Sequence, residues 1–207
     1  LILRDFFPQW AIDSGLLKKK SLITYFFRFF EYVTYLSADV IGVQSPANIH
    51  VYKKQNSYNH PNVEVLYNWA STDTDFETEA EFARQLLHKH KLEDKFIFFY
   101  GGNMGEAQDM PNLVRLAINL QGSKHAHFLF ICRGEQFDFM CNQKISLNLE
   151  NVTILPALSQ NQYSALLKNI DVGLFSLSAK HTSHNIPGKL LGYIQAKIPV
   201  LGSVNYN

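Results

Sequence analysis

The sequence predicts an α/β protein built on doubly wound parallel sheets. Short runs rich in valine, isoleucine, leucine and phenylalanine recur along the chain, and amphipathic stretches separate most of them. Strands buried on both faces have continuous apolar runs, and strands that alternate with helices form parallel sheets. With 207 residues, 46% of them hydrophobic, the chain is long enough for one large domain or one and a half.

Eight apolar runs are the predicted strands. They span residues 1–3, 38–43, 62–67, 96–101, 126–132, 151–155, 171–176 and 198–202. The polar residues 68–78 interrupt this pattern, so we expect a linker there, with one α/β unit before it and another after it. Because the chain starts on an apolar run without a methionine, we expect a piece of a longer protein.

Four amphipathic stretches are the predicted helices of the second unit, at residues 79–90, 109–121, 159–169 and 187–196. Ser159 and Gln162 have the spacing of a capping box, and Asp109 is the expected N-cap of a helix with Pro111 in its first turn.

Charge and composition argue against several classes of protein. Lysine plus arginine number 19 and aspartate plus glutamate 18. The net charge is therefore too small to attract nucleic acid over a long distance. Two cysteines, Cys132 and Cys141, are too few for a disulfide scaffold or a thiolate zinc site. No apolar run reaches the roughly 20 residues that span a bilayer.

A glycine-rich turn follows the predicted strand at residues 96–101. Gly101, Gly102 and Gly105 allow a ligand to approach the backbone, and the N–H groups of the next helix suit a phosphate. The spacing matches neither the dinucleotide fingerprint nor the P-loop. The alternative is an ordinary tight turn between a strand and a helix.

Two cations follow other predicted strands. Lys189 lies in the first turn of the helix that begins near Pro187 and Gly188. Its positive charge is unfavourable beside the positive end of the helix dipole, and a bound anion would offset that cost. Arg133 comes directly after the run at residues 126–132. Since the carboxyl ends of parallel strands share one edge of a sheet, these residues and the glycine turn predict a diphosphate site. The alternative is a solvated lysine.

An aromatic helical stretch at residues 18–36 has only a narrow polar stripe, formed by Thr24, Arg28 and Glu31. Such a helix is either packed between a sheet and a neighbouring domain or lies on an anionic bilayer surface. The residues expected at such a membrane surface are Lys18, Lys19, Lys20, Phe26, Phe27 and Phe30.

Asp5 follows the first predicted strand, where it could be a general base, an acceptor contact or the ion partner of Arg4. The chain has eight histidines, of which only His181 and His184 have a spacing compatible with a metal. We predict no metal site.

Several of these segments resemble bacterial family 4 glycosyltransferases of the GT-B fold, most closely the branch that builds O-antigen and capsule repeats with N-acetylated aminosugars. Residues 99–110 resemble that family's donor-side glycine loop, and residues 151–156 resemble its nucleotide-base segment. Residues 186–201 resemble its donor-phosphate helix and the following strand. Residues 3–8 and 65–69 resemble the late strand of its N-terminal domain and its interdomain junction.

This resemblance implies two Rossmann-like domains with doubly wound parallel sheets, here as a fragment. Residues 1–68 would be the C-terminal part of the acceptor domain, and residues 69–207 most of the donor domain without its final crossover helix. The implied activity is transfer of a sugar, with retention, from a UDP-sugar to a polyprenyl-linked or saccharide acceptor in lipopolysaccharide or capsule synthesis. It implies a cytoplasmic protein, peripheral at the inner face of the cell membrane, with no cofactor besides the UDP-sugar co-substrate.

The family's motifs assign roles to residues of this chain. His184 and Asp5 are the expected catalytic residues. The expected donor-binding residues are Gly101, Gly102, Asn103, Gly105, Arg133, Pro156, Asn185, Gly188, Lys189 and Leu190.

This chain departs from the family pattern at two places. Asn103 and Gln108 replace the family's basic pair, so Arg133 and Lys189 are expected to hold the diphosphate. The family's two glutamates fall on His184 and Gly192. A nucleotide-sugar 2-epimerase and a non-catalytic interaction subunit are the alternative functions.

Overall fold

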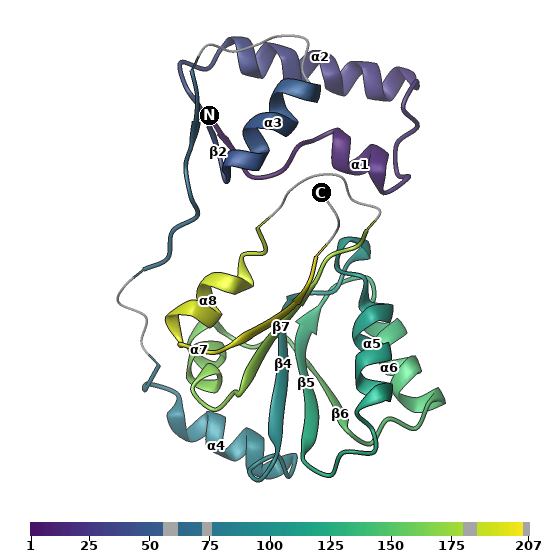
Figure 1. Ribbon diagram of the computed structural model, residues 1–207, viewed down its shortest axis with the longest axis vertical. Coiled ribbons are helices and arrows are strands. Elements are labelled where there is room, and N and C mark those ends of the chain that lie inside the picture. Colours follow the sequence, from purple (N-terminus) through teal and green to yellow (C-terminus); the bar gives the residue numbers. More distant parts are fainter. Residues whose placement is uncertain (56–61, 72–75, 180–185, 205–207) are drawn as a thin grey trace. The chain divides into compact units, whose positions relative to one another are not determined.

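The computed structural model describes residues 1–55, 62–71, 76–179 and 186–204, which form two compact units (Figure 1). The first contains Leu1–Trp69 and short later segments, and the second contains Ala70–Ser178 and Pro187–Val204. Both are α/β units with parallel sheets, so the predicted fold class is confirmed. Among the described helices, none combines the length and apolar character that crossing a membrane requires.

The first unit is a small parallel sheet in the order β1-β2-β3 with three helices. Its elements are β1 (Ile2–Leu3), α1 (Gln9–Asp13), α2 (Leu22–Leu36), β2 (Ile41–Val43), α3 (Pro46–Gln55) and β3 (Val63–Val65). The sheet and helices enclose a core of Leu3, Phe6, Tyr35, Ile41, Val43 and Tyr52. Ser21 caps α2 by accepting a hydrogen bond from the backbone N–H of Thr24.

The second unit contains five parallel strands in the order β6-β5-β4-β7-β8. They are β4 (Phe96–Asn103), β5 (Ala126–Arg133), β6 (Val152–Pro156), β7 (Val172–Ser176) and β8 (Val200–Ser203). The chain adds β5 and β6 on one side of β4, then returns to place β7 on the other side. Such a reversal leaves a crevice at the carboxyl ends of the central strands, where open α/β sheets bind ligands.

Helices cover both faces of this sheet (Figure 1). They are α4 (Ala80–Lys89), α5 (Met110–Asn119), α6 (Phe137–Ser146), α7 (Gln160–Leu167) and α8 (Lys189–Gln195), with a short 3-10 helix at Glu106–Gln108. One core joins the sheet to α4, α7 and α8, and a second joins it to α5 and α6. The sheet is therefore buried on both faces, as its continuous apolar strands predicted.

All eight predicted strands and all four predicted helices of the second unit are present, with ends shifted by a few residues. Sequence reasoning missed α1, α3 and α6. In α6, apolar residues do not gather on one side, because Met140 is buried whereas Phe139 and Ile145 are exposed. The capping box of Ser159 and Gln162 is confirmed, but Asp109 does not cap α5 through its side chain.

Candidate functional site

A pocket of about 660 Å³ opens at the carboxyl ends of β4 and β5 in the second unit. Residues from the end of β4, the end of β5, the loop after β6, α7 and α8 line it. Its lining includes Gly101, Gly102, Asn103, Arg133, Tyr163 and Lys189. This is the edge of the sheet at which the sequence predicted a phosphate site.

The two glycines at the end of β4 allow the pocket to form. A Cβ on Gly101 would lie 2.4 Å from the Tyr163 ring, so any side chain there would displace the tyrosine. Gly102 has a φ of 114°, a left-handed conformation that other residues adopt only under strain. Its open side faces Lys189, whose Cε would lie 3.8 Å from an added Cβ. At Gly102 the backbone therefore has no side chain between it and the side chain of Lys189.

Lys189 is the first residue of α8, and its side chain is directed toward the end of β4. Its Nζ lies 3.4 Å from the centroid of the Tyr100 ring, in cation–π geometry. The same atom is buried and has no hydrogen-bond partner among the described residues. A buried ammonium without a partner is costly, and this one lines a pocket large enough for a ligand.

Burial lowers the pKa of the Lys189 ammonium to about 7, and the nearby Cys132 opposes that shift. Burial likewise raises the pKa of the Cys132 thiol to about 12 and raises the pKa of Tyr100, so both groups are neutral at physiological pH. Neither supplies a negative charge to the lysine. A bound anion would supply one, and it would favour the protonated amine.

Arg133 supplies a second cation at the pocket. It is the last residue of β5, pairs in register with Asn103 of β4, and is exposed. An exposed guanidinium and a buried ammonium along one pocket suit a ligand with two adjacent anionic groups.

Three tyrosines fix the walls around Lys189. The Tyr100 hydroxyl donates to the backbone oxygen of Asn103 over 2.6 Å, which fastens its ring to the end of β4. The Tyr193 hydroxyl lies 3.1 Å from the Leu174 oxygen and accepts from the Gly101 N–H over 3.3 Å, linking β7 to β4. Tyr163 packs on Gly101 and lines the pocket. Tyr100 and Tyr163 were not among the expected site residues.

The structure brings together six of the expected donor-binding residues, which line one pocket: Gly101, Gly102, Asn103, Arg133, Gly188 and Lys189. Gly105, Pro156 and Leu190 are not among its described lining residues. Gly105 instead donates its N–H to Gln108, Pro156 borders another hollow beside α4, and Leu190 packs against the core.

The roles of the two expected catalytic residues stay predictions. His184 lies outside the described residues, as does Asn185. Asp5 is exposed after β1 in the first unit, and its neighbour Arg4 stacks over the Trp69 ring at 5.7 Å. Within the described residues, no group of three histidine, cysteine, aspartate or glutamate side chains is arranged to hold a metal ion.

Other residues around Lys189 and the pocket gave a weaker signal in the sequence. Tyr100 directly precedes the two glycines, yet its apolar surroundings indicate only a strand. Tyr163 has helical core spacing, and only the packing on Gly101 shows that it lines the pocket. Gly192 lines it as well, and an added Cβ there would meet only Leu167 at 3.5 Å and Tyr163 at 3.8 Å.

No protein-family model matches the chain. The probable glycosyltransferase WbjE of Pseudomonas aeruginosa is 24% identical over 201 residues, which are 97% of this chain and 50% of that protein. The chain thus spans about half the length of the curated relative it matches.

Solved structures share the fold. WaaG, a glycosyltransferase involved in lipopolysaccharide biosynthesis, matches with a TM-score of 0.74 at 16% identity, over 97% of this chain and 55% of WaaG. Anabaena HepE in complex with UDP-glucose matches with a TM-score of 0.72 at 15% identity, over 99% of this chain and 52% of HepE. The chain therefore has the α/β fold of GT-B glycosyltransferases, over about half the length of these proteins.

Proposed function

We propose that the second unit is the donor-binding part of a glycosyltransferase that uses a UDP-sugar. The observation that carries this proposal is the buried, unpartnered Nζ of Lys189 beside the pocket at the carboxyl end of β4. The likeness to WbjE supports the activity, and the HepE complex with UDP-glucose supports the choice of nucleotide.

The pocket's cations suit the charge changes of glycosyl transfer. The bond between the sugar's anomeric carbon and the β-phosphate oxygen breaks, and its electron pair stays on the departing UDP. The acceptor hydroxyl oxygen forms the new bond to that carbon, and its proton passes to the departing diphosphate. Lys189 and Arg133 would stabilise the negative charge that grows on the diphosphate.

The finer assignments extend the proposal. We infer that the transferred sugar is an N-acetylated aminosugar, that its configuration is retained, and that the acceptor is polyprenyl-linked or a saccharide. The place of action would be the inner face of a bacterial cell membrane, in synthesis of lipopolysaccharide, O-antigen or capsule. These assignments rest on the resemblance of the glycine loop and the donor-phosphate helix.

Calorimetric titration of the protein with UDP tests the proposal. We expect saturable binding that weakens by at least about tenfold in Lys189→Ala and by a smaller factor in Arg133→Ala, because each removes a charge-assisted contact. Lys124→Ala is the matched control, since Lys124 is exposed just before β5, at the opposite end of that strand.

Failure to bind UDP would overturn the donor-site assignment, and so would equal binding by all three variants. Transfer is tested separately by the release of UDP from a UDP-sugar in the presence of a sugar acceptor. Epimerisation of the donor sugar without transfer to the acceptor would favour the 2-epimerase.

A further inference from the structure

The pocket of the second unit extends along one side of α8. Lys189, Gly192 and Gln195 line it at intervals of three residues, so they lie on the same side of the helix. At 1.5 Å per residue, Gly192 is about 4.5 Å and Gln195 about 9 Å beyond Lys189 along the helix axis. Since Lys189 and Arg133 are assigned to the diphosphate, the nucleoside of a bound UDP would follow this side of α8, with its ribose beside Gly192. This placement rests on the proposed function.

In the described lining, the walls that would face the ribose have no carboxylate. They come from the loop after β6, from α7 and from α8, which all lie within residues 151–207. The single acidic residue of that range is Asp171. It directly precedes β7, and its carboxylate accepts a hydrogen bond from the Ile97 N–H at the start of β4 over 2.7 Å. Asp171 therefore lies at the opposite edge of the sheet from the pocket.

Two glutamates lie nearer to the cations, but they are engaged within the loops that follow β4 and β5. Glu135 accepts from the Glu106 N–H over 3.2 Å, and Glu106 accepts from the Gln136 side chain over 3.2 Å. Neither glutamate belongs to the described lining of the pocket. The charge that this lining presents to a ligand therefore comes from Lys189 and Arg133 and is positive.

The space beside Gly192 is not filled by the protein. A Cβ on Gly192 would meet only Leu167 at 3.5 Å and Tyr163 at 3.8 Å, which are ordinary contact distances. By contrast, a Cβ on Gly101 or Gly173 would lie 2.4 Å or 2.6 Å from a tyrosine ring. Packing thus requires a glycine at positions 101 and 173 but would admit a side chain at position 192. The ribose side of the pocket is open there.

Doubly wound nucleotide-binding domains can hold the ribose 2′-hydroxyl with an aspartate or a glutamate. A hydroxyl that donates to a carboxylate contributes more to binding than one that donates to a neutral amide. A site built around a hydroxyl also rejects an analogue without it, because the polar groups of the site are left unpaired. We propose that this pocket does not select for the ribose 2′-hydroxyl, so that 2′-deoxynucleoside diphosphate sugars are donors alongside UDP-sugars.

Calorimetric titration of the whole protein with UDP and with dUDP tests this inference, because the two ligands differ by one oxygen atom. We expect the dissociation constant of dUDP to exceed that of UDP by less than about tenfold, which is the most that a hydroxyl gains from a neutral acceptor. A hydroxyl held by a carboxylate would give a ratio above about tenfold.

Gly192→Glu should create the missing selection and raise the ratio above about tenfold. Its charge also repels both diphosphates, so the ratio is the readout and not either affinity alone. Gly192→Gln adds a side chain of the same length without the charge and should keep the ratio below about tenfold. Gly122→Glu is the matched control, because it adds the same charge at an exposed position before β5, where nothing lies within 4 Å of an added Cβ. Both affinities should there equal those of the wild type.

A wild-type ratio above about tenfold would overturn this inference, while the binding of UDP would still support the donor site. An unchanged ratio in Gly192→Glu would overturn the position of the ribose beside Gly192, and the inference with it. Failure of both nucleotides to bind would instead overturn the proposed function itself. The two kinds of failure are therefore distinguishable.

Discussion

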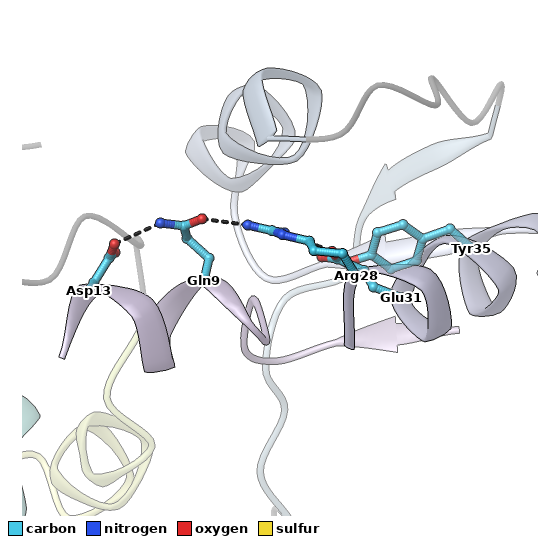
Figure 2. A network of polar contacts seen from close by, with 5 residues as sticks. All are labelled: Gln9, Asp13, Arg28, Glu31 and Tyr35. Carbon is cyan, nitrogen blue, oxygen red and sulfur yellow. Dashed lines mark hydrogen bonds and ion pairs between the residues drawn. The ribbon is translucent and has the colours of Figure 1, made fainter. Parts of the chain in front are cut away.

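Each unit holds a cation among apolar residues, half-buried Arg28 in the first and buried Lys189 in the second, but the two cations have different partners. Arg28 in the first unit donates to Glu31 and Gln9, and Glu31 also accepts from Tyr35 (Figure 2). The Nζ of Lys189 in the second unit lies over the aromatic face of Tyr100 and has no hydrogen-bond partner among the described residues. The sequence indicates part of this difference, since Glu31 lies one helical turn after Arg28 and no acidic residue lies near Lys189.

This difference indicates that Arg28 has a structural role, whereas Lys189 is available to bind a ligand. A buried charge with a complete set of partners stabilises one arrangement of its neighbours, whereas an incomplete set costs stability until something completes it. The first unit therefore uses its charge to orient α2, and the second unit keeps its charge available in a pocket.

The largest expected effect comes from removing the partner of Arg28. Glu31→Ala leaves the guanidinium and the Tyr35 hydroxyl without their acceptor, so the free energy of unfolding of the first unit should fall by about 2–3 kcal/mol. Tryptophan fluorescence during urea denaturation reports this unit alone, because Trp10 and Trp69 both belong to it.

Two controls define the origin of that loss. Glu31→Gln keeps an acceptor oxygen and should lose less. Glu81→Ala breaks an exposed pair with Arg84 in the second unit and should change stability by less than about 0.5 kcal/mol. If Glu31→Ala were as mild as Glu81→Ala, the network would not be what orients α2.

Removing the unpartnered charge of Lys189 should raise the free energy of unfolding instead of lowering it. Lys189→Met replaces the ammonium with an apolar chain of similar length, so the second unit should gain about 2 kcal/mol at pH 6 while UDP binding is lost. Far-UV circular dichroism in urea measures the gain. A Lys189→Met protein less stable than the wild type at pH 6 would show that the lysine has a partner.

The gain in Lys189→Met should depend on pH. Below pH 7 the lysine is protonated in both the folded and the unfolded wild type, so the whole cost of burying its charge is present. Between pH 7 and about 10.4 only the unfolded chain keeps the proton, and wild-type stability rises with pH. The advantage of Lys189→Met should therefore shrink across that range.

UDP affinity should fall with rising pH above 7 for the same reason. Binding a diphosphate requires the charged lysine, so affinity should decrease by up to about tenfold per pH unit between pH 7 and 9. Cys132 and Tyr163 do not titrate there, since burial raises the pKa of each to about 12, and Tyr100 is also raised. The terminal phosphate of UDP is already ionised in this range.

Lys189→Arg is the control for this pH dependence, because its guanidinium stays charged. Calorimetry of Lys189→Arg should show weaker binding with a flat pH profile. A wild-type profile that is equally flat would mean that Lys189 does not exchange a proton when UDP binds.

The sequence predicted the fold well and the site only in outline. Buried parallel strands appear as continuous apolar runs, so β4 to β8 could be located before the structure was known. Arg133 and Lys189 follow from the rule that ligands bind at the carboxyl ends of strands. The position of Gly101 also follows from that rule, but its packing on Tyr163 depends on a residue 62 positions away, as the two numbers show.

Partnerships between distant residues could not be predicted. Arg28 and Glu31 were recognised as a polar stripe, yet nothing local says that α1 supplies Gln9 and so draws the stripe inward. Likewise, the spacing of Lys189 indicates a helix start but not the Tyr100 ring beneath its Nζ. Local patterns show which residues share a face, and tertiary packing decides which way that face points.

The smallest effect concerns the ring beneath Lys189. Tyr100→Phe keeps the aromatic face and loses only the hydrogen bond to Asn103, so UDP affinity should stay within about threefold of the wild type. Tyr100→Leu removes the cation–π contact and should weaken binding by about tenfold. It should also lower the pH at which affinity starts to fall, because the charged amine loses its cation–π contact. Phe and Leu variants with the same affinity and the same pH profile would show that the ring only fills space.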